Sequence, residues 1–149
     1  MKQKTVIGNW KNYLNGVETI KLSKQIVGEK IPDYIRLMIS PCNLYLNEVN
    51  EIMKESSVEV IGQNITSYDS SSDTGGVTAI GLNDMGVNRS IIGHSEVRKR
   101  NKGFKSEDIL KEIIPAQFKF ILCFENTQQI PFDILNNDFE MILAYEPVW

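Results

Sequence analysis

Two residues of this chain have the types and surroundings that acid–base chemistry needs, a glutamate and the single histidine. Glu146 follows an apolar run and precedes Pro147. Taken alone, a glutamate at the end of a strand is usually a solvated side chain. A buried carboxylate in that place is suited to removing a proton from a carbon next to a carbonyl. His94 stands between Gly93 and Ser95, where a strand turns toward a helix.

The position of His94 indicates which form of its ring is stable. Taken alone, a histidine is more often a structural hydrogen-bonding residue than a catalyst. Amide dipoles at a helix N-terminus disfavour an imidazolium there, so the ring is expected to be neutral. A neutral imidazole can donate a proton to an oxygen on which negative charge develops.

Several polar neighbours have simple explanations when each is read without its context. Lys11 would be an exposed charge and Asn9 a turn residue, because both follow the first apolar run. Ser95 would be a helix cap, and Glu96 a carboxylate in the first turn of a helix. Cys123 ends an apolar run and would be a small packing residue.

The elements that must position these residues alternate along the whole chain. Strand, helix and strand, repeated at intervals of about 20–30 residues, predict a parallel sheet with crossover helices. The expected strands are residues 5–8, 35–40, 58–62, 89–93, 118–123 and 141–145. Two helices are expected from their apolar faces, one formed by Val17, Ile20 and Val27 and the next by Tyr45, Val49, Ile52 and Met53. A short helix is expected around 81–85, and another begins at Ser106, buries Ile109, Leu110, Ile113 and Ile114, and ends at Pro115. A last helix, reduced in length, is expected around 130–135.

The polar residues gather directly after the strands, which favours a barrel over an open sheet. They are Asn9 and Lys11, Gln63 and Asn64, His94 to Glu96, and Glu146. A (β/α) barrel builds its site at that end of every strand, whereas an open sheet binds ligands mainly at one switch point. The near-continuous apolar pairs Ile121-Leu122 and Ile142-Leu143 predict strands that are buried on both faces.

The composition excludes several classes of partner. There are 16 basic and 19 acidic residues, with a net charge of −3 and no basic run longer than Arg98-Lys99-Arg100, so no nucleic acid is expected. No apolar stretch approaches the roughly 18 residues of a membrane helix, and no signal core opens the chain, so we expect a cytoplasmic protein. Cys42 and Cys123 lack metal-ligand spacing and are expected to be reduced thiols. No linker divides the 149 residues, which predicts one domain spanning 1–149.

Three strings resemble the triosephosphate isomerase family, in that family's order and with roughly its spacing. They are Gly8-Asn9-Trp10-Lys11, Gly93-His94-Ser95-Glu96 and Ala144-Tyr145-Glu146-Pro147-Val148-Trp149. The last string is the most specific, and the first is weak by itself. The resemblance covers essentially the whole chain. It implies an α/β fold, a TIM (β/α)8 barrel truncated after the sixth strand.

The resemblance also implies a role for each residue. Glu146 would be the general base that shuttles a proton between two carbons of a triose, and His94 the electrophile. Lys11 would neutralise the substrate phosphate and the growing oxyanion. Asn9 would help to hold the substrate oxygen, and Glu96 would pair with Lys11.

The implied reaction interconverts dihydroxyacetone phosphate and D-glyceraldehyde 3-phosphate through an enediolate, in glycolysis and gluconeogenesis, without a metal or organic cofactor. Ser95 would support the site, and Gln63-Asn64 would support Lys11. The resemblance further implies a homodimer that forms through the Gln63–Thr78 loop region.

The chain departs from the family's pattern in two respects. The second half of the lid, the last two strands and their phosphate-binding loops have no counterpart, so the chain alone is expected not to be fully competent. Near the expected interface, Gly76, Val97 and Lys105 stand where the family usually has Glu, Arg and Glu. We hypothesise that apolar and backbone contacts replace that ion-pair cluster.

Two other interpretations stay open at this point. The chain would be a catalytically inactive truncated barrel or an assembly fragment, or it would be a different phosphosugar-binding barrel enzyme. The second requires three family strings to coincide by chance. Isomerase activity of the chain, with and without a separate C-terminal piece, distinguishes the first from an isomerase.

Overall fold

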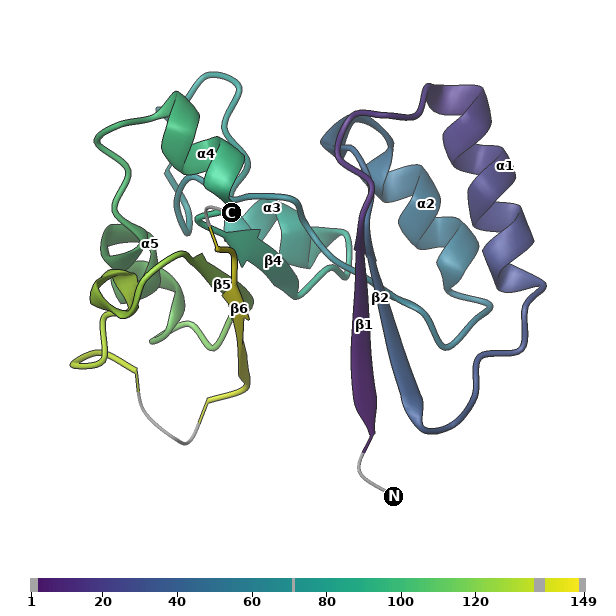
Figure 1. Cartoon of the computed structure of the whole chain (residues 1–149). Helices are drawn as coiled ribbons and strands as arrows, with labels where there is room; N and C mark the ends of the chain where they lie inside the picture. Colours follow the sequence, from purple (N-terminus) through teal and green to yellow (C-terminus); the bar gives the residue numbers. More distant parts are fainter. Residues whose placement is uncertain (1–2, 71, 136–138, 148–149) are drawn as a thin grey trace. The chain divides into compact units, whose positions relative to one another are not determined.

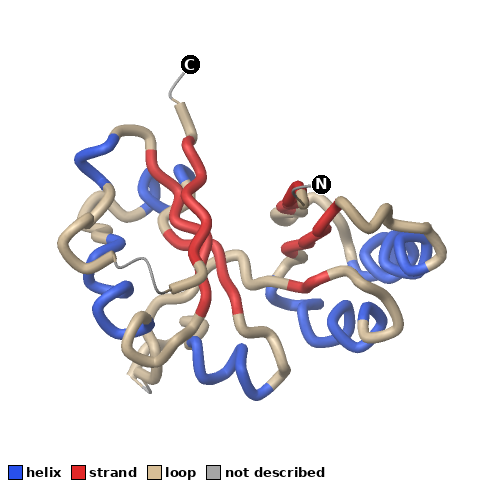
Figure 2. Tube along the Cα trace, turned by 90° about the horizontal axis from the view of Figure 1, so that it is seen from below, coloured by secondary structure: helices blue, strands red, loops and turns tan. Residues whose placement is uncertain are grey.

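The structure is a computed structural model that describes residues 3–70, 72–135 and 139–147. The chain divides into two compact units, Met1–Gln63 and Asn64–Trp149, and each is described by itself. Both units contain parallel strands joined through helices, which confirms the predicted α/β class (Figures 1 and 2). The single domain spanning 1–149 stays a prediction. Within the described residues, no helix has the length and apolar character that crossing a bilayer requires.

The first unit is a parallel sheet in the order β1-β2-β3 with helices on one face (Figure 1). Its elements are β1 (Lys4–Asn9), α1 (Gly16–Val27), β2 (Ile35–Ser40), the 3-10 turn η1 (Asn43–Tyr45), α2 (Leu46–Met53) and β3 (Glu59–Val60). Strand β1 pairs with β2 along its whole length, from Lys4 opposite Ile35 to Asn9 opposite Ser40. The predicted strand 35–40 is confirmed with the same bounds, whereas the strand predicted at 58–62 is shorter.

Helix α1 is confirmed as a helix with Ile20 and Val27 half-buried, but the prediction that Val17 belongs to the inner face is wrong. Its buried residues are Thr19 and Ser23, and Val17 is 80% exposed. At about 100° per residue, Val17 lies some 200° around the helix from Thr19. A capping box between Asn15 and Glu18 fixes where the helix begins. The buried Ser23 hydroxyl donates to the Thr19 carbonyl at 2.8 Å, so this small polar face is satisfied internally.

The second unit is a parallel sheet in the order β4-β5-β6. Its elements are α3 (Ala79–Asp84), β4 (Arg89–Ile92), α4 (Ser95–Arg100), α5 (Ser106–Ile113), β5 (Lys119–Phe124), the 3-10 turn η2 (Thr127–Gln129) and β6 (Met141–Tyr145). The predicted helix start at Ser106 and the strand 141–145 are confirmed. The helix expected around 130–135 is wrong, because that stretch forms turns in which Ile134 N donates to Pro131 O at 3.1 Å.

The core of the second unit is formed by strands β4 and β5 and by one face of α5. All four residues of β4 are buried, and Ile109, Leu110 and Ile113 bury the predicted face of α5. Burial of both faces is confirmed for Ile121-Leu122 in β5. It is wrong for Ile142-Leu143, since Leu143 is 44% exposed on β6, the outer strand of the described sheet.

Candidate active site

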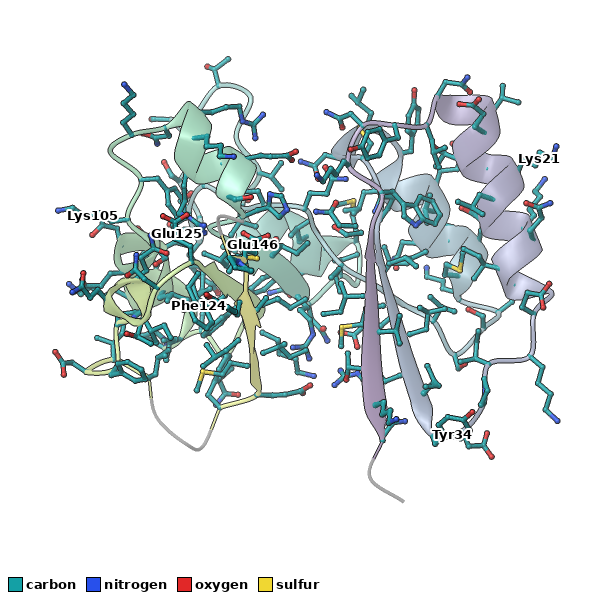
Figure 3. All side chains as sticks on the ribbon, viewed as in Figure 1. Lys21, Tyr34, Lys105, Phe124, Glu125 and Glu146 are labelled. Carbon is teal, nitrogen blue, oxygen red and sulfur yellow. The ribbon has the colours of Figure 1, made fainter. Side chains whose placement is uncertain are left out.

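Glu146 is placed by the register between strands β5 and β6. Phe124 lies opposite Tyr145, and the Glu146 amide continues the ladder by donating to the Phe124 carbonyl at 2.7 Å. Because parallel strands end at one edge of a sheet, Glu146 and Glu125 stand at neighbouring strand ends (Figure 3). The backbone of the candidate base is therefore fixed by the sheet itself.

The Glu146 carboxylate lies against the turn that follows β4. Its Oε1 atom is 3.1 Å from His94 Nε2, and its Oε2 atom accepts a hydrogen bond from the Ser95 amide at 2.8 Å. The side chain is 22% exposed, so it is partly shielded from water yet open on one side. The structure thus brings together Glu146, His94 and Ser95, three residues that the sequence placed in the site.

His94 is the N-cap of α4, and this role fixes the tautomer of its ring. Nδ1 accepts a hydrogen bond from the Glu96 amide at 3.2 Å, so a neutral ring carries its proton on Nε2. That Nε2–H group is the one that faces Glu146. The Glu96 carboxylate lies 3.6 Å from Nδ1, outside hydrogen-bonding distance. In this tautomer the Nε2–H donor is aimed into the site.

Gly93 makes the turn into His94 possible. Its φ of +69° lies in the left-handed region, where a side chain is strained. A Cβ at this position would lie 3.2 Å from the Phe104 ring and 3.4 Å from the Cys123 carbonyl oxygen. A glycine is therefore required both by the backbone angle and by the close approach of Phe104.

Three further residues, which the sequence did not single out as functional, lie near Glu146: Arg98, Glu125 and Cys123. Arg98 lies 3.7 Å from Glu146 Oε2 and also contacts Glu125, while Cys123 is buried beside the same carboxylate. In the sequence Arg98 belongs to the short basic run Arg98-Lys99-Arg100. Its position four residues after His94 is the signal that could have found it, since residues so spaced share one face of a helix. A cavity of about 240 Å³ borders Arg98 and Cys123.

The Cys123 thiol is held in its neutral form. Burial, and then the negative charge of Glu146, raise the pKa of this thiol to about 12. The unfolded thiol ionises at lower pH than the folded one, so the folded state binds more protons between roughly pH 9 and 12. Stability conferred by the neutral thiol is therefore lost as pH rises through that range.

We accordingly expect the free energy of unfolding to fall above pH 9 by up to about 1.4 kcal/mol per pH unit on account of Cys123. Urea unfolding of the wild-type chain and of Cys123→Ala, measured at steps from pH 8 to 10.5, isolates this contribution as the difference between two curves. The two curves should converge as pH rises. Parallel curves would show that the thiol does not titrate differently on folding.

The first unit holds the candidate residues Asn9 and Lys11. Lys11 has a φ of +49°, an unusual value for a residue with a side chain, and its amide donates to Asn9 Oδ1 at 2.9 Å. Gln63 Nε2 donates to the Lys11 carbonyl at 2.8 Å and lies 3.2 Å from the Ser40 carbonyl. Gln63 thus contacts the Lys11 backbone as predicted, whereas support of Lys11 by Asn64 stays a prediction.

Asn9 and Lys11 belong to one unit and His94, Ser95, Glu96 and Glu146 to the other. The pairing of Glu96 with Lys11 would join the two units, and it stays a prediction. Pro147 is described, whereas the end of the string, 148–149, lies outside the described residues. Among the residues that the structure describes, no three His, Cys, Asp or Glu side chains gather as a metal ion would need.

Comparison with known proteins decides the family. The family model described as Triosephosphate isomerase matches residues 4–149. The chain belongs to the triosephosphate isomerase family. It is similar to the triosephosphate isomerase of Borrelia hermsii, with 32% identity over the whole chain and 68% of the relative, and to that of Mycoplasma genitalium, with 29% identity over the whole chain and 67% of the relative. It spans about two thirds of the length of these relatives.

The loop that the triosephosphate isomerase family resemblance assigns to subunit contact is anchored within the second unit. The Tyr68 amide donates to the Glu112 carboxylate of α5 at 2.8 Å, and the Thr66 amide donates to the Val77 carbonyl at 2.9 Å. A Cβ on Gly76 would lie 2.0 Å from Asp73 Oδ2. A side chain at Gly76 would therefore require the Asp73 and Thr66 side chains to move.

Proposed function

We propose that the chain interconverts dihydroxyacetone phosphate and D-glyceraldehyde 3-phosphate, as triosephosphate isomerases do. The observation that supports this most directly is the pair formed by Glu146 and the neutral His94, whose Nε2 lies 3.1 Å from the carboxylate. One member can remove a proton from carbon, and the other can protonate the adjacent oxygen. The reaction needs these two steps, and both partners lie at the ends of parallel strands.

Glu146 acts first in the proposed mechanism. At rest its two carboxylate oxygens are engaged by His94 and by the Ser95 amide. Binding of the triose separates Glu146 from these partners and brings it to the carbon next to the carbonyl. The carboxylate takes a proton from that carbon, the electrons of the carbon–hydrogen bond form a double bond between the two carbons, and the π electrons of the carbonyl move onto its oxygen to give an enediolate. Glu146 then returns the proton to the neighbouring carbon.

During the same reaction, His94 stabilises the negative charge that develops on the two substrate oxygens. Once Glu146 has left, the Nε2–H group is free to donate to the developing oxyanion. The Glu96 amide at Nδ1 holds the ring in the tautomer that donates from Nε2. The imidazole thus hydrogen-bonds to each oxygen in turn as the carbonyl group passes from one carbon to its neighbour.

Lys11 contributes a positive charge to the substrate's oxyanion and phosphate in this proposal. Its backbone is held by Asn9 Oδ1 and by Gln63 Nε2 in a left-handed conformation that few lysines adopt. Such fixed geometry is typical of a side chain that must be aimed before the substrate arrives.

We further propose a cytoplasmic homodimer formed through the Gln63–Thr78 region, active in glycolysis and gluconeogenesis, with apolar and backbone contacts in place of the family's ion-pair cluster.

Hydrogen exchange at carbon tests the proposal separately from complete turnover. The chain is incubated with dihydroxyacetone phosphate in deuterated water, alone and with a polypeptide that supplies the remaining third of a relative's length. We expect deuterium next to the carbonyl, together with glyceraldehyde 3-phosphate. Absence of both products from both mixtures would contradict the proposal and favour a non-catalytic assembly fragment.

A further inference from the structure

Arg98 connects the ends of three neighbouring strands. It lies on α4, and its side chain is 16% exposed. One guanidinium nitrogen, Nη1, donates to the carbonyl of Gly93 after β4 and, at 3.1 Å, to that of Cys123 in β5. The other, Nη2, donates to Glu125 at 3.3 Å, and Nη1 lies 3.7 Å from Glu146 Oε2 after β6.

The shape of the guanidinium suits this arrangement better than an ammonium would. Arginine presents five N–H donors in a rigid plane, whereas lysine offers one compact charge on a flexible stem. Arg98 lines a cavity, and its polar contacts reach the ends of three strands. A fixed positive charge therefore stands next to Glu146 Oε2, the oxygen that accepts from the Ser95 amide.

We propose that Arg98 is a positioning residue for Glu146, holding the carboxylate on the Ser95 amide until substrate displaces it. The role of Glu146 as the base rests on the proposed function. The holding contact itself does not depend on it and can be measured without substrate. Glu125 competes for the same guanidinium, so it should weaken the hold that Arg98 exerts on Glu146.

The Ser95 amide is a direct reporter of this hold. It lies in the first turn of α4, where backbone N–H groups have no partner within the helix. Its hydrogen bond to Glu146 Oε2 is therefore the contact expected to protect it from exchange with solvent. The ring nitrogens of His94 give a second signal, since the chain has one histidine and its Nε2 faces Glu146 Oε1.

The experiment compares amide exchange in the full chain and its variants by NMR. In Arg98→Met, exchange at Ser95 should rise about tenfold, which corresponds to roughly 1.4 kcal/mol. Amides of the buried strand residues Ile92 and Leu122 should keep their protection. Arg98→Lys should fall between wild type and Met. The matched control Arg100→Met, on an exposed residue of the same helix, should leave Ser95 unchanged.

Glu125→Gln separates positioning from a structural role, because the two predict opposite signs. Releasing Arg98 from Glu125 should slow exchange at Ser95 and leave the His94 Nε2 signal in place, whereas Arg98→Met should displace that signal. If Arg98 has only a structural role, Arg98→Met and Glu125→Gln should each lose protection from amide exchange both at Ser95 and in the strands. That outcome, or an unchanged Ser95 in both Arg98→Lys and Glu125→Gln, overturns the proposal even if Arg98→Met does not fold.

Discussion

Glu146→Gln is expected to lower turnover by about 10²- to 10⁴-fold, the range by which a positioned general base accelerates proton transfer. Glutamine occupies the same space, but its amide cannot accept a proton from carbon. It also has only one acceptor oxygen, whereas Glu146 presents one oxygen to His94 Nε2 and another to the Ser95 amide. The glutamine can therefore satisfy one of these two donors and not both.

The measurement is kcat in both directions, with circular dichroism to show that the fold survives. Glu107→Gln is the matched control, since Glu107 forms an exposed pair with Lys111 on α5 and the same charge is removed. The control should keep its activity within a small factor. Near-normal turnover of Glu146→Gln would refute the assignment of the base.

The second large effect is expected at His94, where two substitutions separate its two roles. Asparagine places an oxygen near the position of Nδ1 and is a favoured N-cap, so it can still accept from the Glu96 amide. It has no group at the position of Nε2. His94→Asn should therefore keep the stability of α4 while losing about 10²- to 10⁴-fold in turnover.

Glutamine makes the opposite change, because its amide nitrogen reaches the position of Nε2 while the cap is lost. His94→Gln should keep part of the activity and lower the free energy of unfolding by about 1 kcal/mol. Urea unfolding and kcat, measured on both variants, give two independent rankings. If each variant loses turnover in proportion to its loss of free energy of unfolding, His94 acts mainly as a structural cap and not as the electrophile.

Local patterns in the sequence were enough to predict the strands that carry the site. Residues 35–40 and 141–145 form strands with the predicted bounds because apolar runs are bounded there by polar or proline residues. The inner face of α1 was not predictable in this way. There the buried positions are Thr19 and Ser23, and the Ser23 hydroxyl is satisfied by a hydrogen bond to the Thr19 carbonyl within the helix and not by apolar contact.

The site, too, has residues that the sequence could predict and residues that it could not. His94 and Glu146 could be named because their flanking residues form specific strings, and the structure brings the two side chains to 3.1 Å. The part played by Arg98 depends on contacts that span 25 and 27 residues along the chain, to Cys123 and Glu125. Contacts across such distances are set by strand pairing, so residue type and local spacing do not reveal them. The Lys11–Glu96 pair depends on both units and stays a prediction.

The hydrogen bonds between β5 and β6, which end at Glu146, also determine where the chain can tolerate insertions and deletions. The register of β5 against β6, closed by the bond from the Glu146 amide to the Phe124 carbonyl, sets which way the glutamate points. A slip of one residue would turn it to the opposite face of the sheet. Part of the connection between the two strands is anchored, because Ile130 is buried and Gln129 Oε1 accepts from the Glu125 amide at 2.8 Å, but loops as a class accept insertions and deletions at small cost. A change of length in the connection that keeps this anchor would therefore leave the direction of the Glu146 side chain to the pairing of the strands.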